Sequence, residues 1–217
     1  MPHAAGPTNQ IDLNASKETQ MTQTAAPTST LIGQFATSPV RRIALVFAGV
    51  CLITLGAKVQ VPFWPVPMTL QTLALMVIFA ASGMRLSLEI IFAYLALGLI
   101  GIPVFAGASA GPLYLAGPTA GFLIGFVAAA LIVGWAADQG MARRPLALFG
   151  AMIAADVVIF ALGFLWLGFV FTTSSGATLG ADYAFSNGVK PFLLADLVKL
   201  ALAVVVITGI GRRAQRG

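Results

Sequence analysis

Ionisable side chains occur inside the apolar stretches of this 217-residue sequence, where a charged group is costly unless it has a partner or a purpose. The last apolar stretch carries Asp196 and Lys199, and a spacing of three residues places both on one face of a helix. A carboxylate beside an ammonium offers an acceptor next to a donor, which suits a small ligand with adjacent N–H and C=O groups. An intrahelical ion pair that neutralises itself is an equally good interpretation of these two residues.

Three further ionisable residues lie within or near the apolar stretches. Asp156 is the deepest, because counting from Leu146 at about 1.5 Å per residue puts it about 15 Å into its predicted helix. At that depth it can meet Lys199 of the neighbouring helix, which would then be shared between Asp156 and a ligand. Lys58 and Glu89 sit near helix ends, where long side chains reach the interface, so we interpret them as structural.

The composition indicates that these residues belong to a membrane protein. Hydrophobic residues make up 59% of the chain and charged residues 9%, whereas soluble domains carry about 25% charged residues. Apolar runs of membrane-spanning length recur from Ile43 to Ile210. They predict an all-α fold, a polytopic bundle of six transmembrane helices in one domain over residues 39–217. Residues 1–38, rich in Thr, Ala, Gln, Ser and Pro, are predicted to be a disordered cytoplasmic tail.

The positions of the basic residues predict the orientation of the bundle. Arginines cluster at every second boundary of the apolar runs, and Arg85 is expected in one of these turns, so both termini are predicted to be cytoplasmic. The alternate boundaries, at residues 61–67, 106–118 and 172–189, are then external. The six predicted helices cover residues 43–59, 69–83, 88–104, 119–137, 146–171 and 191–212.

The residue types that the sequence lacks exclude several functions. Cys51 is the single cysteine and His3 the single histidine, so the chain cannot form an internal disulfide or a His/Cys metal cluster. A nucleotide-binding loop of the Gly-x-x-x-x-Gly-Lys-Ser/Thr type is also absent from the sequence. We therefore expect no enzyme, no metal and no cofactor, and any ATP hydrolysis must come from another chain.

Three ordered motifs stand out in the sequence. Residues 56–62 and 67–72 read GAKVQVP and PMTLQT, residues 115–122 read LAGPTAGF, and residues 190–199 read KPFLLADLVK. Together they resemble the BioY family, the biotin-specific substrate-binding subunits of energy-coupling factor (ECF) transporters. The resemblance covers residues 43–210, which is the whole predicted membrane domain. The family's loop motif usually has glycine at the position of Ala120, and one added methyl group is a small departure.

The resemblance implies a function for the ionisable pair. Members of the family capture biotin from outside and work with a transmembrane coupling protein and two cytoplasmic ATPases, here in the lipid bilayer of a bacterial cytoplasmic membrane. The family's Asp-x-x-Lys motif falls on Asp196 and Lys199. Biotin's ureido ring has two N–H donors and a carbonyl, so Asp196 can accept and Lys199 can donate. The opposite pose, with Lys199 on the valerate carboxylate, stays open.

Aromatic residues near the outer side are expected to form the walls of the pocket, namely Trp64, Tyr114 and Phe192. Gln71 is expected either to bond a neighbouring helix or to contact the contents of the pocket. Nucleic acid is not expected as a partner, because the basic residues sit at helix ends and not on one face.

Two alternatives concern partners and energy. Ala44 and Ala48 have the spacing that permits close helix contact, and in the family a matching alanine motif docks onto the coupling protein; packing within the same bundle is an equally good interpretation. The alternative function is a self-sufficient secondary transporter in which Asp156, Asp196 and Lys199 form a proton relay.

Overall fold

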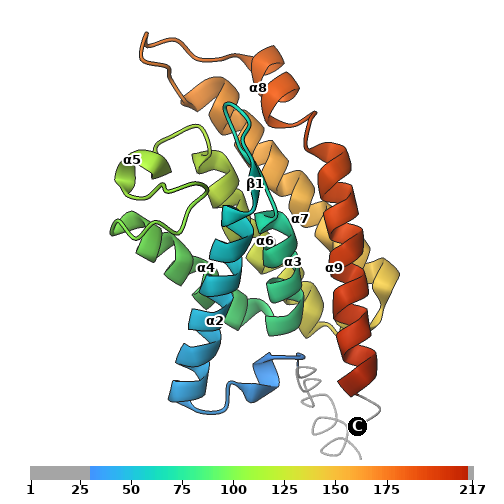
Figure 1. Cartoon of the computed structure of the whole chain (residues 1–217). Helices are drawn as coiled ribbons and strands as arrows, with labels where there is room; N and C mark the ends of the chain where they lie inside the picture. The colour runs from blue at the N-terminus through green and yellow to red at the C-terminus, as the bar shows by residue number, and fades with distance from the viewer. Residues whose placement is uncertain (1–29, 215–217) are drawn as a thin grey trace, which may run out of the picture.

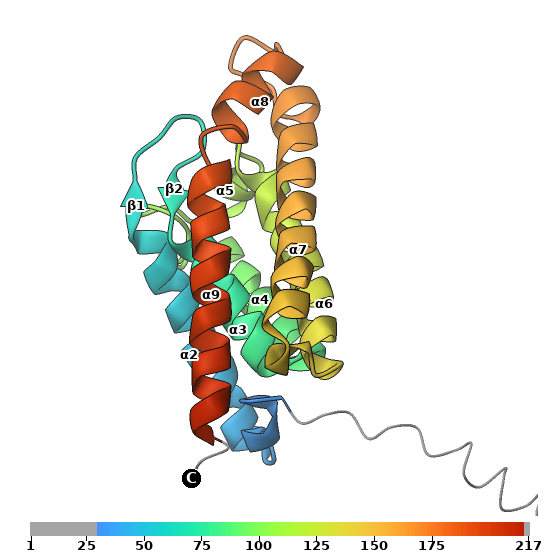
Figure 2. The ribbon, with the colours of Figure 1, turned by 90° about the vertical axis from the view of Figure 1, so that its right-hand side faces the viewer.

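A computed structural model of the chain describes residues 30–214 as a bundle of helices (Figure 1). A two-stranded antiparallel hairpin, β1 (Gln60–Val61) and β2 (Met68–Thr69), lies towards one end of the bundle together with the short helix α8 (Ala181–Gly188), as Figures 1 and 2 show. We name this end the loop end. The described N- and C-terminal residues lie at the opposite, terminal end.

The described elements comprise long helices and short connecting turns. The long helices are α2 (Pro39–Lys58), α3 (Gln71–Ser82), α4 (Met84–Leu99), α6 (Ala120–Asp138), α7 (Pro145–Leu165) and α9 (Leu193–Ala214). The short elements are η1 (Gly33–Phe35), α5 (Pro112–Leu115), η2 (Met141–Arg143) and the π-helical segment η3 (Trp166–Val170). The predicted all-α class is confirmed for the part of the chain described.

Four of the described helices are long and apolar enough to cross a membrane: α2, α6, α7 continued through η3, and α9. The other two long helices are shorter, with 12 residues in α3 and 16 in α4, and α4 also carries Arg85 and Glu89. The molecule is therefore a mostly helical bundle with membrane-spanning elements. The count of six spans remains a prediction.

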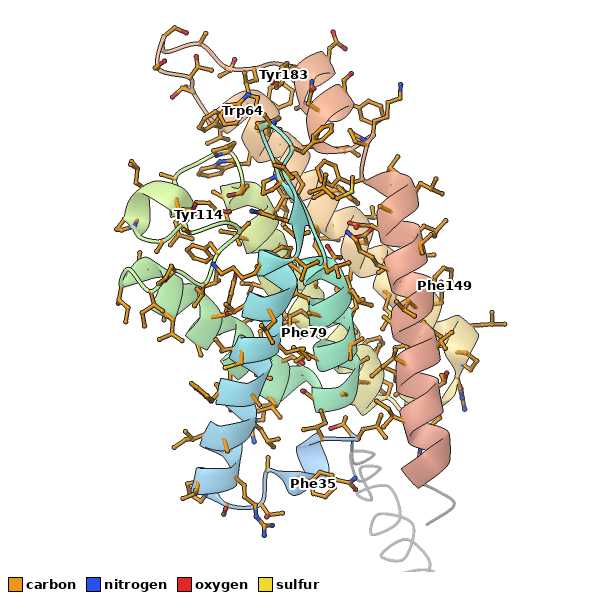
Figure 3. All side chains as sticks on the ribbon, viewed as in Figure 1. Phe35, Trp64, Phe79, Tyr114, Phe149 and Tyr183 are labelled. Atoms are coloured by element: carbon orange, nitrogen blue, oxygen red, sulfur yellow. The ribbon has the colours of Figure 1, made fainter. Side chains whose placement is uncertain are left out.

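Helix α3 lies in the middle of the bundle, in contact with α2, α4, α6 and α9. Its side chains are apolar nearly all round, which is the pattern of a buried helix. Leu75, Met76 and Phe79 are completely buried, and Figure 3 labels Phe79 among the surrounding helices. This central position places the first residue of α3, Gln71, under the loop end.

A single residue, Gly83, separates α3 from α4, and its φ of +78° is in the left-handed region that glycine adopts without strain. The carboxylate of Asp138 accepts a hydrogen bond from the Met84 backbone N–H at 3.0 Å and so caps α4. The sequence prediction that Arg85 marks a turn is therefore wrong, because Arg85 lies in the first turn of α4.

The loop end holds two short helices within stretches predicted to be loops. Helix α5 lies within residues 106–118, and α8 lies within the polar stretch 172–189. Ala184 of α8 is buried and packs close to Gly168 of η3, so a short amphipathic segment covers the end of α7. Composition alone does not predict α8, because its polar residues outnumber the apolar residues of its single buried face.

Residues 30–38 belong to the predicted tail, yet they contact the bundle. The Ile32 backbone N–H donates to the Ala81 carbonyl at 2.9 Å, and the Thr30 hydroxyl donates to the Ser82 carbonyl at 3.0 Å. These bonds supply partners for carbonyls at the end of α3. The rest of the predicted tail, residues 1–29, lies outside the described residues.

Candidate ligand-binding site

A cavity opens among α3, α6, α7 and α9 towards the loop end. Its empty space is about 560 Å³, which includes open solvent at its mouth. Apolar side chains make up most of its lining. The lining residues are Val66, Pro67, Thr69, Gln71, Thr72, Ala106, Tyr114, Thr119, Phe122, Leu123, Phe126, Ile159, Phe160, Phe192, Asp196 and Lys199.

The charged groups of the cavity come from the first two turns of α9. Asp196 is 4% exposed and Lys199 is 8% exposed, and the Lys199 ammonium donates a hydrogen bond to the Asp196 carboxylate. The ion pair anticipated from the sequence therefore forms, and both of its members also line the cavity. The cost of removing two charges from water offsets much of the energy gained from their attraction. Such a pair therefore adds little to stability, which favours a role in ligand binding.

The pair retains the capacity to bind a ligand. An ammonium has three N–H donors and a carboxylate has about four acceptor sites. The structure gives Lys199 a hydrogen bond to Asp196, and the Thr72 side chain also interacts with the Asp196 carboxylate. Donors and acceptors therefore stand side by side on one wall, as a ligand with adjacent N–H and C=O groups requires.

Gln71 makes the helix contact that the sequence left open and also lines the cavity. Its amide N–H donates to the Tyr94 hydroxyl at 2.9 Å, and that hydroxyl donates to the Val104 carbonyl at 3.2 Å. The first residue of α3 is thus tied through α4 to the loop that follows α4.

Aromatic rings form two walls of the cavity. Phe192 lies 6.2 Å from Phe63 and 6.4 Å from Phe160, measured between ring centroids. On another side, Tyr114 stacks on Phe105 at 4.8 Å with an interplanar angle of 12°. Burial raises the pKa of the Tyr114 hydroxyl above its ordinary value, so it stays a neutral donor.

Trp64 is the predicted wall residue that the structure does not bring to the cavity. Its side chain is 71% exposed, Figure 3 shows it at the loop end, and it is not among the described lining residues. In the same hairpin, Val66 lines the cavity and the Phe63 ring contacts Phe192. An exposed tryptophan at a bundle end suits an anchor at the level of lipid headgroups.

Asp156 lies on α7 beside the charged pair. It is 8% exposed and interacts electrostatically with Asp196 and Lys199, and one of its carboxylate oxygens has no hydrogen-bond partner among the described residues. Lys199 makes its hydrogen bond with Asp196 and not with Asp156. Asp156 is therefore a neighbour of the cavity's charged wall.

Several lining residues were missed by the sequence reasoning. Thr72 directly follows Gln71 in the PMTLQT motif, and Phe160 follows Asp156 by four residues on α7, which puts it on the same helix face. These two had a usable signal. Thr119 had a weaker one, its place in the LAGPTAGF motif.

Ala44 and Ala48 are exposed on α2, whereas Gly49 and Ile53 of the same helix are buried and Gly49 packs on Ile90 of α4. The two alanines therefore lie on the outer face of the described bundle, where lipid or another chain can reach them.

These features define a mostly helical membrane protein with a largely apolar cavity at one end, whose wall carries a buried ion pair. A family model described as the BioY family matches residues 21–216, and the chain belongs to the BioY family. The assignment drawn from the three sequence motifs is thereby confirmed.

Named relatives agree with the family assignment. The chain is 36% identical over 166 residues to a probable biotin transporter BioY of Pyrococcus horikoshii, covering 76% of this chain and 93% of that protein. It is 33% identical to biotin transporter BioY of Thermotoga maritima, covering 75% and 92%, and 31% identical to biotin transporter BioY2 of Lactococcus lactis, covering 75% and 86%.

The fold is similar to that of a solved structure, the S-component for biotin from an ECF-type ABC transporter. The TM-score is 0.67 at 22% sequence identity, and the match covers 82% of this chain and 95% of the other. At that identity the likeness establishes the shared fold.

Proposed function

We propose that this chain is a biotin-binding transport protein and that biotin occupies the cavity at the loop end. The observation that carries the proposal is the buried Asp196–Lys199 pair on the wall of an otherwise largely apolar, aromatic cavity. Membership in the BioY family, whose named relatives are biotin transporters, supports biotin as the ligand.

The residues of the cavity match the chemistry of biotin. Asp196 accepts hydrogen bonds from the ureido N–H groups, and Lys199 donates one of its remaining N–H groups to the ureido carbonyl. The fused rings and the alkyl chain then contact Phe160 and Phe192. In the opposite pose the Lys199 ammonium pairs with the valerate carboxylate.

Binding of biotin by the purified chain alone tests this proposal. Saturable binding of labelled biotin in detergent, without any ATPase present, is the expected result. A correctly folded chain that binds no biotin would refute it. Biotin methyl ester separates the two poses, because it lacks the carboxylate charge and loses affinity only if Lys199 pairs with that group.

We further propose that the chain works as the substrate-binding subunit of an ECF transporter, with a coupling protein and two ATPases. The likeness to an ECF S-component and the outward position of Ala44 and Ala48 support this partnership. Replacing both alanines with leucine should leave biotin binding intact but abolish co-purification with the partners and ATP-driven uptake. The control is Ala201→Leu, which introduces leucine at one exposed alanine position of α9.

The proposed setting is a bacterial cytoplasmic membrane, with six spans and both termini in the cytoplasm. Reporters fused at Arg143 and at the C-terminus should both be cytoplasmic, and one within residues 172–189 should be external. Opposite sides for the first two reporters would refute the six-span topology.

A second candidate function is secondary transport by the chain alone, favoured by the buried Asp156 oxygen beside the charged pair. Uptake by cells that express only this chain separates the candidates. Uptake that survives ATP depletion and collapses with an uncoupler would favour the relay, and the ECF proposal predicts the reverse.

A further inference from the structure

Lys58, the last residue of α2, makes specific contacts that its position near a helix end does not suggest. Its ammonium donates to three backbone carbonyls of one loop, those of Pro103 at 2.6 Å, Phe105 at 2.8 Å and Gly107. An ammonium has three N–H donors, so these carbonyls occupy the full donor set. A group that merely reached towards the interface would have no need of three fixed acceptors.

The loop that Lys58 holds spans residues 100–111 and has no regular secondary structure. Its backbone bonds lie mainly at its ends, where Ile102 N–H donates to Leu97 and Gly111 N–H donates to Gly98. In the middle, three alternate carbonyls converge on the Lys58 ammonium. Phe105 is completely buried, so its carbonyl requires a partner, and the Lys58 ammonium supplies it.

The same loop forms a wall of the cavity. The Phe105 ring is completely buried between Tyr94, at 5.5 Å and 80°, and Tyr114, at 4.8 Å and 12°. Ala106 and Tyr114 line the cavity directly. Phe105 therefore has two roles. Its backbone carbonyl is one of the three that Lys58 binds, and its ring supports Tyr114.

We propose that Lys58 is a positioning residue whose ammonium holds the 100–111 loop in the conformation that presents Ala106 and Tyr114 to the ligand. The proposal rests on the proposed function, because it concerns the wall of the same biotin cavity. Without the ammonium the loop stays anchored at its ends but samples other conformations. The apparent dissociation constant for biotin then rises, because a smaller fraction of the molecules has the loop in its binding conformation.

The first test compares Lys58→Met with Lys190→Met, which removes an exposed lysine near the loop end that makes no side-chain hydrogen bond within the described residues. Lys58→Met should speed amide hydrogen exchange within residues 100–111 and raise the dissociation constant for biotin on the order of tenfold, as for a competent fraction of about one tenth. Exchange in α6 and α7 should stay unchanged. Lys190→Met should change neither quantity.

The second test restores the ammonium after folding. Lys58→Cys is made together with Cys51→Ser, because Cys51 is exposed and would react as well. Alkylation of the folded protein with 2-bromoethylamine joins an aminoethyl group to the sulfur of the introduced cysteine and releases bromide. Slow loop exchange and tight binding should both return, whereas the uncharged ethyl group from iodoethane should restore neither.

The outcomes distinguish the two proposals. Unchanged loop exchange in Lys58→Met overturns the role of Lys58, as does equal rescue by the ethyl group. Faster loop exchange with an unchanged dissociation constant also overturns it, because the ligand would then be indifferent to the loop. Failure of the wild-type chain to bind biotin would refute the proposed function, and the exchange measurements would still decide whether the ammonium holds the loop.

Discussion

The cavity has two sides that are built in different ways. On the helical side, Asp196 and Lys199 meet because one helix presents residues three apart on the same face. On the loop side, individual side chains bind backbone carbonyls, as the Lys58 ammonium does for Pro103 and Phe105 and the Tyr94 hydroxyl does for Val104. The helical side thus supplies the polar chemistry, and the loop side supplies a shape that depends on a few separate bonds.

The loop after α5 is held in the same way. The indole N–H of Trp166 donates to the Gly117 carbonyl at 2.9 Å, from the first residue of the π-helical segment η3. Gly117 precedes Thr119, which lines the cavity. Substitutions on the helical side should therefore remove a charge partner, whereas substitutions on the loop side should make a wall of the cavity more flexible.

The largest effect is expected from Lys199→Met, which leaves the Asp196 carboxylate buried without its cation. Breaking a buried pair in this way should lower the free energy of unfolding by roughly 3–5 kcal/mol. Denaturant unfolding in detergent micelles measures it. Adding Asp196→Asn should recover most of the stability but not biotin binding, and a double variant as unstable as Lys199→Met would contradict the pairing argument.

Asp196→Asn alone also breaks the buried pair, so its effect on binding is measured on protein that remains folded. It replaces a charged acceptor of ligand N–H groups and should weaken biotin binding by roughly 1.5–3 kcal/mol, as for hydrogen bonds to charged groups. The dissociation constant from calorimetry is the measurement, and Asp182→Asn, in the exposed first turn of α8, is the matched control. Equal affinity of the two variants would remove Asp196 from the site.

Trp166→Phe should have a smaller effect, because it removes one neutral hydrogen bond from the loop side. Loss of the bond to Gly117 should weaken biotin binding by about 1 kcal/mol and speed proteolysis within residues 111–119. Trp135→Phe, at an exposed position of α6, is the control. If both variants behave like the wild type, the indole bond does not set the shape of this wall.

The smallest effect is expected from Trp64→Ala, since Trp64 points away from the cavity. The change in biotin binding free energy should stay within about 0.5 kcal/mol, as for exposed positions. A tenfold rise in the dissociation constant would show that the hairpin tip reaches the ligand, and the loop side would then extend further than the described lining.

The two sides also differ in how well the sequence predicted them. The proximity of Asp196 and Lys199 followed from the regular geometry of one helix, and their inward direction followed from the cost of charge in lipid. The carbonyls bound by Lys58 lie 45 to 49 residues away and are backbone atoms, so no side-chain pattern marks them. The sequence predicts that Lys58, a lysine at a helix end, reaches the membrane interface. That interpretation does not include its carbonyl partners.

The helix boundaries show the same limit. The sequence predicts that α4 starts at Leu88, because Arg85 is expected in a turn. In the structure Gly83 alone makes the reversal, and Asp138, 54 residues from Met84, caps the new helix. Apolar periodicity located the long elements. It could not supply the distant partner that decides where one of them begins.

The buried central helix α3 also has a consequence for energy conservation. Its 12 residues span about 18 Å, short of the ~30 Å hydrocarbon core, and Gln71 at its start lines the cavity. Below the cavity, Leu75, Met76 and Phe79 fill the axis with hydrocarbon, which a hydrated ion cannot enter without losing its water. The chain should therefore show no ionic conductance in a planar bilayer, and a cell can carry many copies without discharging its membrane potential.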